Sequence, residues 1–67
     1  MNTLECMQLK KNAILRFKMF YARFDKHLEK AKEERFSFAI NGTDCLLRLK
    51  YHGKLYKQHY KLNQITF

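Results

Sequence analysis

Cys45, His52 and His59 come nearest to a metal-ligand pattern in this 67-residue chain, because they recur at intervals of seven residues. A zinc site needs its ligands to converge on one point, as closely spaced Cys and His pairs do. The strand pairing expected here directs Cys45 inward, places His52 in a turn and directs His59 outward. We therefore expect no metal site and no cofactor.

The carboxylates best placed for acid–base chemistry lie four residues apart in a lysine-containing stretch: Asp25, Glu29 and Glu33. Acids and lysines interleaved at helical spacing are typical of a solvated, ion-paired helix face. Ser37 lies in an expected strand, outside any Gly-x-Ser-x-Gly elbow. The only glycines, Gly42 and Gly53, are expected in turns and form no phosphate-binding loop. The sequence therefore predicts no catalytic residues and a protein that is not an enzyme.

Charge is the strongest chemical signal, since fourteen Lys and Arg against six Asp and Glu give a net charge of +8. So basic a surface favours polyanions. We expect a small accessory or regulatory protein that binds nucleic acid, principally DNA, although the sequence carries no helix-turn-helix, RNP or zinc-finger signature. Its phosphate contacts are expected from cations on a helix and on the outer face of a sheet: Arg16, Arg23, Lys30, Arg48, Lys50, Lys57 and Lys61.

The alternative function is a protein-binding inhibitor or adaptor, of phage or mobile-element type, that docks on an acidic face of a host enzyme handling nucleic acid. Leu46 and Leu55 lie among the expected sheet cations and would serve as its apolar anchors. A membrane is not expected as a partner, because the apolar run Met19–Ala22 is too short to span one. Two cysteines expected to be reduced and no visible signal peptide predict a cytoplasmic location.

The sheet cations depend on a hairpin over Phe36–Tyr51, in which Asn41-Gly42 is expected to form a two-residue type I′ turn. That loop pairs Ile40 with Thr43, Phe38 with Cys45, and Phe36 with Leu47. Because side chains alternate along a strand, one face then collects the apolar residues Phe36, Phe38, Ile40, Cys45, Leu47, Leu49 and Tyr51. The other face carries the cations, and Asp44 is expected to pair with Lys61 there.

A second turn at His52-Gly53 leads into Lys54–Leu62, which we expect to be a third strand. As a strand it adds Tyr56, Tyr60 and Leu62 to the apolar face and strengthens a fragile two-stranded ribbon. A short helix is the alternative for this segment. Asn63–Phe67 is expected to be a terminal extension, with Ile65 and Phe67 against the core.

The N-terminal part, Leu4–Arg35, contains no Gly or Pro and is expected to be one helix of about thirty residues, capped by Asn2-Thr3. Its apolar stripe alternates steps of three and four residues: Ile14, Phe17, Tyr21, Phe24, Leu28 and Ala31. The alternative is a break at Asn12, with a short helix over 3–10 followed by one over 13–34. An unbroken helix of about 45 Å exceeds the length of the expected strands.

Four apolar residues lie outside this stripe, beyond the reach of a single sheet: Leu15, Met19, Phe20 and Ala22. They predict a homodimer through Ala13–Phe24, whereas the alternative is a broken helix that folds back on itself. The sequence as a whole predicts one α+β domain over residues 1–67, with a long N-terminal helix packed on a three-stranded antiparallel meander (α-β-β-β).

Overall fold

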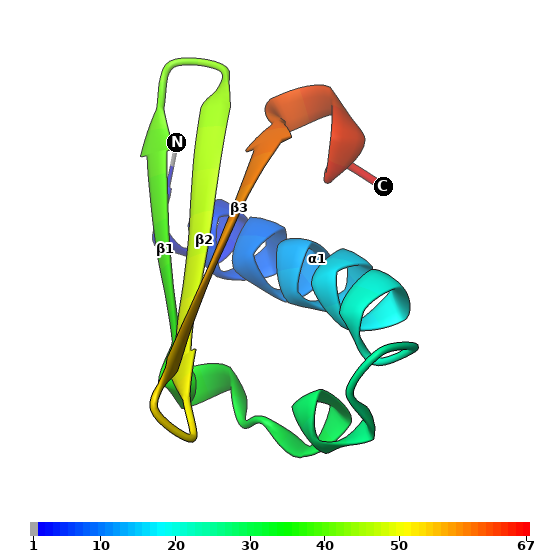
Figure 1. Cartoon of the computed structure of the whole chain (residues 1–67). Coiled ribbons are helices and arrows are strands. Elements are labelled where there is room, and N and C mark those ends of the chain that lie inside the picture. Colours follow the sequence, from blue (N-terminus) through cyan, green and yellow to red (C-terminus); the bar gives the residue numbers. More distant parts are fainter. Residues whose placement is uncertain (1) are drawn as a thin grey trace.

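The structure, a computed structural model, describes residues 2–67 and has the predicted α+β arrangement (Figure 1). Met1, part of the predicted domain, lies outside the described residues. One α-helix, α1 (Thr3–Tyr21), precedes three strands, β1 (Phe36–Asn41), β2 (Asp44–Tyr51) and β3 (Lys54–Lys61). Short 3₁₀ helices flank the sheet: η1 (Lys26–Lys30), η2 (Glu33–Arg35) and η3 (Leu62–Gln64). The sheet is an antiparallel meander in the order β1-β2-β3, and α1 lies against one of its faces.

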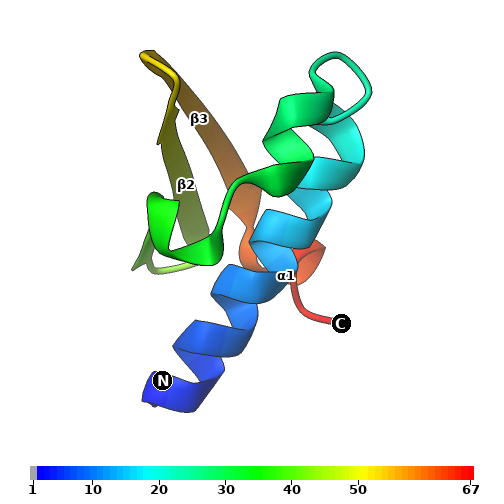
Figure 2. The same ribbon diagram turned by 90° about the horizontal axis from the view of Figure 1, so that it is seen from below.

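The helix begins as predicted, because the Asn2 side chain accepts a hydrogen bond from the Glu5 amide at 2.8 Å. Its first turns extend past the strands (Figure 2), and Leu4 in these turns is exposed to solvent. The helix is continuous through Asn12, so the break considered there is wrong. It ends at Tyr21, however, and not at Arg35, so the prediction of a single helix of about thirty residues is also wrong.

The chain folds back along α1 after Tyr21, and this change of direction ends the helix before the predicted Arg35. Leu28 and Ala31 become buried beside α1 through η1, whereas a straight helix would carry them beyond the small sheet. Lys18 fixes the return, since its Nζ donates to the carbonyl oxygens of Glu29 at 3.1 Å and Ala31 at 2.7 Å. The alternative of a broken, folded-back helix therefore describes this region best.

The first hairpin has a different register from the predicted one. The structure pairs Asn41 with Asp44, Ile40 with Cys45, Phe38 with Leu47 and Phe36 with Leu49. The loop is therefore Gly42-Thr43, in which Gly42 alone has a positive φ, of 64°, the pattern of a type II′ turn. This turn needs one residue of positive φ rather than two, and Asn41 stays in the strand. Each partner shifts by two residues, so every side chain keeps its predicted face.

The third strand is confirmed over Lys54–Lys61, and its turn at His52-Gly53 has positive φ at both positions, 50° and 78°. Leu62 departs from the prediction, because it leaves the sheet and begins η3. Gln58 is the polar residue on the inner face of β3. Its Oε1 accepts a hydrogen bond from the Tyr21 hydroxyl at 2.9 Å, which removes the cost of placing an amide there.

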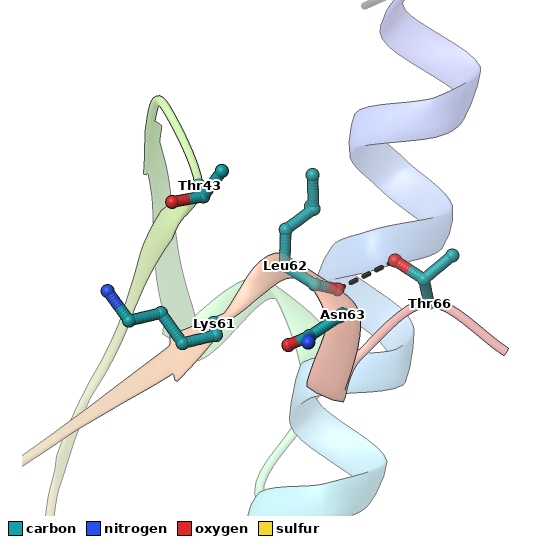
Figure 3. Close-up of a pocket in the computed structure, with 5 residues that line it drawn as sticks. All are labelled: Thr43, Lys61, Leu62, Asn63 and Thr66. Carbon is teal, nitrogen blue, oxygen red and sulfur yellow. Dashed lines mark hydrogen bonds between the residues drawn. The ribbon is translucent and has the colours of Figure 1, made fainter.

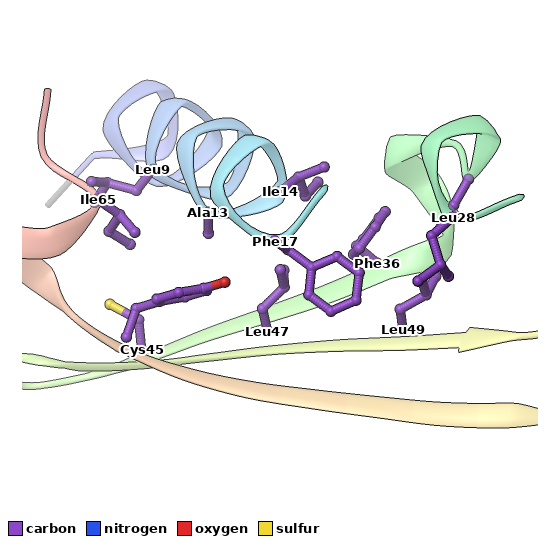
Figure 4. Close-up of a cluster of buried hydrophobic side chains, with 12 residues drawn as sticks. Leu9, Ala13, Ile14, Phe17, Leu28, Phe36, Cys45, Leu47, Leu49 and Ile65 are labelled. Atoms are coloured by element: carbon purple, nitrogen blue, oxygen red, sulfur yellow. The ribbon is translucent and has the colours of Figure 1, made fainter. Parts of the chain in front are cut away.

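The core lies between α1 and the inner face of the sheet (Figure 4). Phe17 is at its centre, with its ring edge-on to Phe36 and Tyr56 at centroid distances of 5.6 and 6.0 Å. Ile65 from the C-terminal segment is fully buried, as predicted, whereas Phe67 is exposed, contrary to the prediction. The Asn12 Nδ2 donates to the Ile65 carbonyl oxygen at 2.9 Å and so joins that segment to the helix.

Candidate functional site

The sheet face turned away from α1 carries the cations expected there. Arg48 on β2 lies directly opposite Lys57 on β3, and Lys50 lies opposite Leu55. All three cations are exposed. Residues directly opposite in an antiparallel pair have Cβ atoms about 4.5–5.5 Å apart, and like charges at such positions are destabilising. We call the surface of Arg48, Lys50 and Lys57 the basic face.

Lys61, also predicted to contact phosphates, lies at the end of this face and forms the predicted ion pair with Asp44. The hydrogen bond and positive charge of Lys61 lower the pKa of the Asp44 carboxyl. The charge of Lys61 is therefore balanced within the chain, whereas Arg48 and Lys57 have no ion pair among the described residues. An anion would gain more at the centre of the basic face than at Lys61.

The surroundings of the basic face are small or apolar. On β1, Ser37 lies opposite Arg48 and Ala39 opposite Leu46, so no large side chain stands on that side. Leu46 is half-buried, and 59% of Leu55 is exposed. The face thus offers positive charge on a surface that a large, rigid anion can approach.

The cations predicted on the helix do not join the basic face. Arg16 lies on α1, which covers the inner face of the sheet, and Arg23 lies in the turn after α1, so neither belongs to the strands that form the basic face. The Arg16 Nη1 lies 3.5 Å from the Gln64 carbonyl oxygen, and its guanidinium carbon lies 6.0 Å from the centre of the Tyr60 ring. Lys30 lies in η1, outside the helix in which it was predicted. The seven predicted residues therefore divide between separate surfaces.

The residues predicted to form a dimer interface are accessible. Leu15, Met19 and Phe20 are exposed, and Ala22 is partly exposed. One chain is described, so the homodimer stays a prediction. Sequence reasoning missed Phe24, which it placed in the buried stripe; the end of α1 at Tyr21 moves Phe24 off that stripe and leaves 78% of it exposed.

A hollow of about 700 Å³ lies between the first hairpin turn and the C-terminal segment (Figure 3). Several of its polar groups already have partners within the chain. The Thr66 hydroxyl donates to the Leu62 carbonyl at 2.6 Å, and the Leu62 amide donates to the Thr43 carbonyl at 2.8 Å. Its cation, Lys61, is paired with Asp44. These groups do not converge as a ligand site requires.

The residues considered for metal binding lie apart. Cys45 is buried under α1, His52 is in the second turn and His59 is exposed on β3. Within residues 2–67, no three His, Cys, Asp or Glu side chains gather closely enough to hold a metal ion. Cys6 and Cys45 are free thiols, and burial, with a smaller effect from Asp44, raises the pKa of Cys45.

No helix in the described part of the chain has both the length and the apolar character needed to cross a membrane. The cytoplasmic location stays a prediction. Comparison with protein-family models, with curated proteins and with solved structures found no match. What this chain does must therefore be inferred from its own residues.

Proposed function

We propose that this protein is a non-enzymatic accessory or regulatory protein that binds nucleic acid, principally duplex DNA, through the basic face. The observation that carries the proposal is the cross-strand pair Arg48–Lys57, two like charges held opposite each other on an exposed surface. The one acid among the outward-facing residues of β2 and β3 is Asp44, which Lys61 already neutralises. Repulsion within the pair is relieved when a phosphate lies between the two cations.

The expected mode of binding is electrostatic. Each phosphate that a Lys or Arg neutralises releases condensed counterions, and this release provides most of the affinity at low salt. Phosphate contacts position a protein on DNA but carry no sequence information. The outward-facing positions of β2 and β3 contain no Asn or Gln that could read a base edge in pairs of hydrogen bonds. We therefore expect tight, salt-sensitive binding with little sequence preference.

A fluorescence titration with a labelled duplex of random sequence tests the proposal. Arg48→Gln/Lys57→Gln removes both charges from the basic face. Each phosphate contact strengthens binding about eightfold when the salt concentration falls from 1 M to 0.1 M. The double variant lacks two contacts and should therefore bind roughly 60-fold more weakly than the wild-type protein at 0.1 M salt. The control, Lys11→Gln/Lys26→Gln, removes the same net charge from exposed positions in the helical layer. Equal losses for the two variants would show that net charge, and not the basic face, provides the affinity.

Leu55 supports a second candidate, a protein-binding inhibitor or adaptor for an acidic partner. Its large exposed side chain lies beside Lys50, and Leu46 lies on the same face, an arrangement of apolar anchors flanked by cations. The duplex titration separates the two candidates. If the wild-type protein does not bind the duplex even at low salt, the adaptor replaces duplex binding as the preferred function of the basic face.

A further inference from the structure

A groove with a different composition lies beside α1, between the end of the helix, the C-terminal segment and the edge of β3, and shares no residue with the basic face. It consists of two adjoining hollows of about 380 and 210 Å³ that share Arg16 and Phe20. The first is completed by Met19, Arg23 and Phe67, and the second extends to the edge of β3. None of the side chains lining either hollow is acidic. We call this surface the Phe20 groove.

Aromatic rings stand open to solvent in and beside the Phe20 groove. The exposed fractions are 56% for Phe20, 78% for Phe24 and 77% for Phe67. The Phe20 and Phe24 ring centroids are 5.8 Å apart. The core is filled by Phe17 and its neighbours and does not use these three rings. Three aromatic side chains exposed on a protein this small mark a candidate interaction site.

Positive charge lies among these rings. Arg16 is positioned on one side by its contacts with the Gln64 carbonyl and the Tyr60 ring. Arg23 lies in the turn that follows α1 and lines the same hollow as Phe20 and Phe67. Cations that follow a nucleic-acid backbone, combined with rings on which bases stack, are the two components of single-strand binding sites.

We propose that the Phe20 groove binds a segment of single-stranded nucleic acid, with bases stacked on Phe20, Phe24 and Phe67 and phosphates held by Arg16 and Arg23. A duplex does not fit this chemistry, because its bases already stack on one another. A second copy of the chain is disfavoured, because it would bring its own Arg16 and Arg23 against the same residues without an acidic side chain in either groove. The inference rests on the proposed function for the class of ligand but uses a separate surface.

The site is tested with labelled single-stranded DNA and RNA oligonucleotides of mixed sequence and with a DNA duplex. Phe24→Ser/Phe67→Ser removes two rings that the fold does not need. Loss of one stacked base costs about fivefold or more in affinity, so the double variant should bind single strands at least about 25-fold more weakly. Phe24→Tyr/Phe67→Tyr keeps both rings and should retain wild-type affinity. The control Leu4→Ser/Met7→Ser removes exposed apolar side chains outside the groove and should have no effect.

Single-strand affinity that falls no further in Phe24→Ser/Phe67→Ser than in the control would overturn the inference. So would a wild-type dimer, seen by sedimentation, that this variant dissociates without changing single-strand affinity, because the groove would then bind a second copy. Failure of the proposed function is a different result. If the protein binds single strands through the groove but does not bind the duplex, the basic face is wrong and the groove stands.

Discussion

Replacing Asn12 with aspartate tests the hydrogen bond that joins α1 to the C-terminal segment. The Asn12 Nδ2 donates to the buried Ile65 carbonyl at 2.9 Å, while its Oδ1 accepts from the Gln8 side-chain Nε2 at 3.0 Å. Asn12→Asp keeps the shape of the side chain but replaces the Nδ2 donor with a carboxylate oxygen. Two acceptors, this oxygen and the Ile65 carbonyl oxygen, then face each other. An unsatisfied buried carbonyl costs about 1–3 kcal/mol, and burial of an unpaired charge adds to that. We expect a loss of about 3 kcal/mol at neutral pH, out of a total stability of about 3–10 kcal/mol for a chain this size.

The loss should depend on pH. The introduced carboxyl is expected to have a raised pKa in the folded state, because it is buried and faces a carbonyl oxygen. A group whose folded pKa is raised contributes stability at low pH and loses it as the pH rises through that value. The gap between Asn12→Asp and the wild-type protein should therefore narrow in acid, where the protonated carboxyl can donate to the Ile65 carbonyl.

Urea unfolding followed by circular dichroism measures this gap at neutral and acidic pH. In thermal unfolding of the same proteins, a loss of 1 kcal/mol in the free energy of unfolding corresponds to a fall in melting temperature of about 4–8 °C for a domain of this size. Gln8→Ala is the control; it leaves the bond between Asn12 and Ile65 intact and should change stability by less than about 0.5 kcal/mol. An Asn12→Asp protein as stable as the wild type at neutral pH, or equally weakened at both pH values, would refute the reasoning.

Three further predictions follow from the fold. Gly42→Ala should lower the free energy of unfolding by about 1–2 kcal/mol, because φ is 64° at this position, whereas Asn41→Ala should lower it little. Equal losses for the two variants would show that the turn residues are Asn41 and Gly42. In the native protein Cys6 should be alkylated much faster than Cys45, whose burial raises its pKa; equal rates would contradict the packing under α1. Burial raises the pKa of Tyr60 to about 12, so the stability that it contributes below pH 10 should be lost as the pH rises through about 12. Urea unfolding of Tyr60→Phe should show less alkaline loss than the wild-type protein, and an identical loss would exclude this effect.

The faces of the sheet could be predicted because they depend on a local pattern of period two. The hairpin register was wrong by two residues, yet Phe38 and Leu47 still point into the core, since an even shift preserves the face. The turn itself was missed for a reason of backbone geometry. A glycine after asparagine is compatible with more than one turn type, and only the pairing along the whole strand selects between them.

The end of the helix could not be predicted from local sequence. The stretch from Tyr21 to Arg35 has neither Gly nor Pro, and its local signal for a break is modest: the Asp25 side chain accepts a hydrogen bond from the His27 amide at 3.0 Å and caps η1. The return is stabilised by distant contacts instead, above all the burial of Leu28 and the bonds from Lys18 to two backbone carbonyls. Such contacts override helix propensity, which is worth less than 1 kcal/mol per residue.

The same distinction applies to the candidate surfaces. Arg48 and Lys57 could be assigned to one face because strand alternation fixes it. Their separation from Arg16 follows from the same alternation, because the helix packs on the apolar face and the strand cations lie on the other face. The exposure of Phe24, by contrast, follows from the position of the helix end, which the apolar periodicity does not reveal.

The central claim, that the basic face binds phosphates, is tested most directly by how duplex affinity changes with salt. The measurement is the slope of log affinity against log salt concentration. For Arg48→Gln/Lys57→Gln this slope should be shallower than that of the wild-type protein by about 1.8, since each phosphate contact contributes about 0.9. For Lys11→Gln/Lys26→Gln the slope should match the wild-type value. An unchanged slope for Arg48→Gln/Lys57→Gln would contradict the claim.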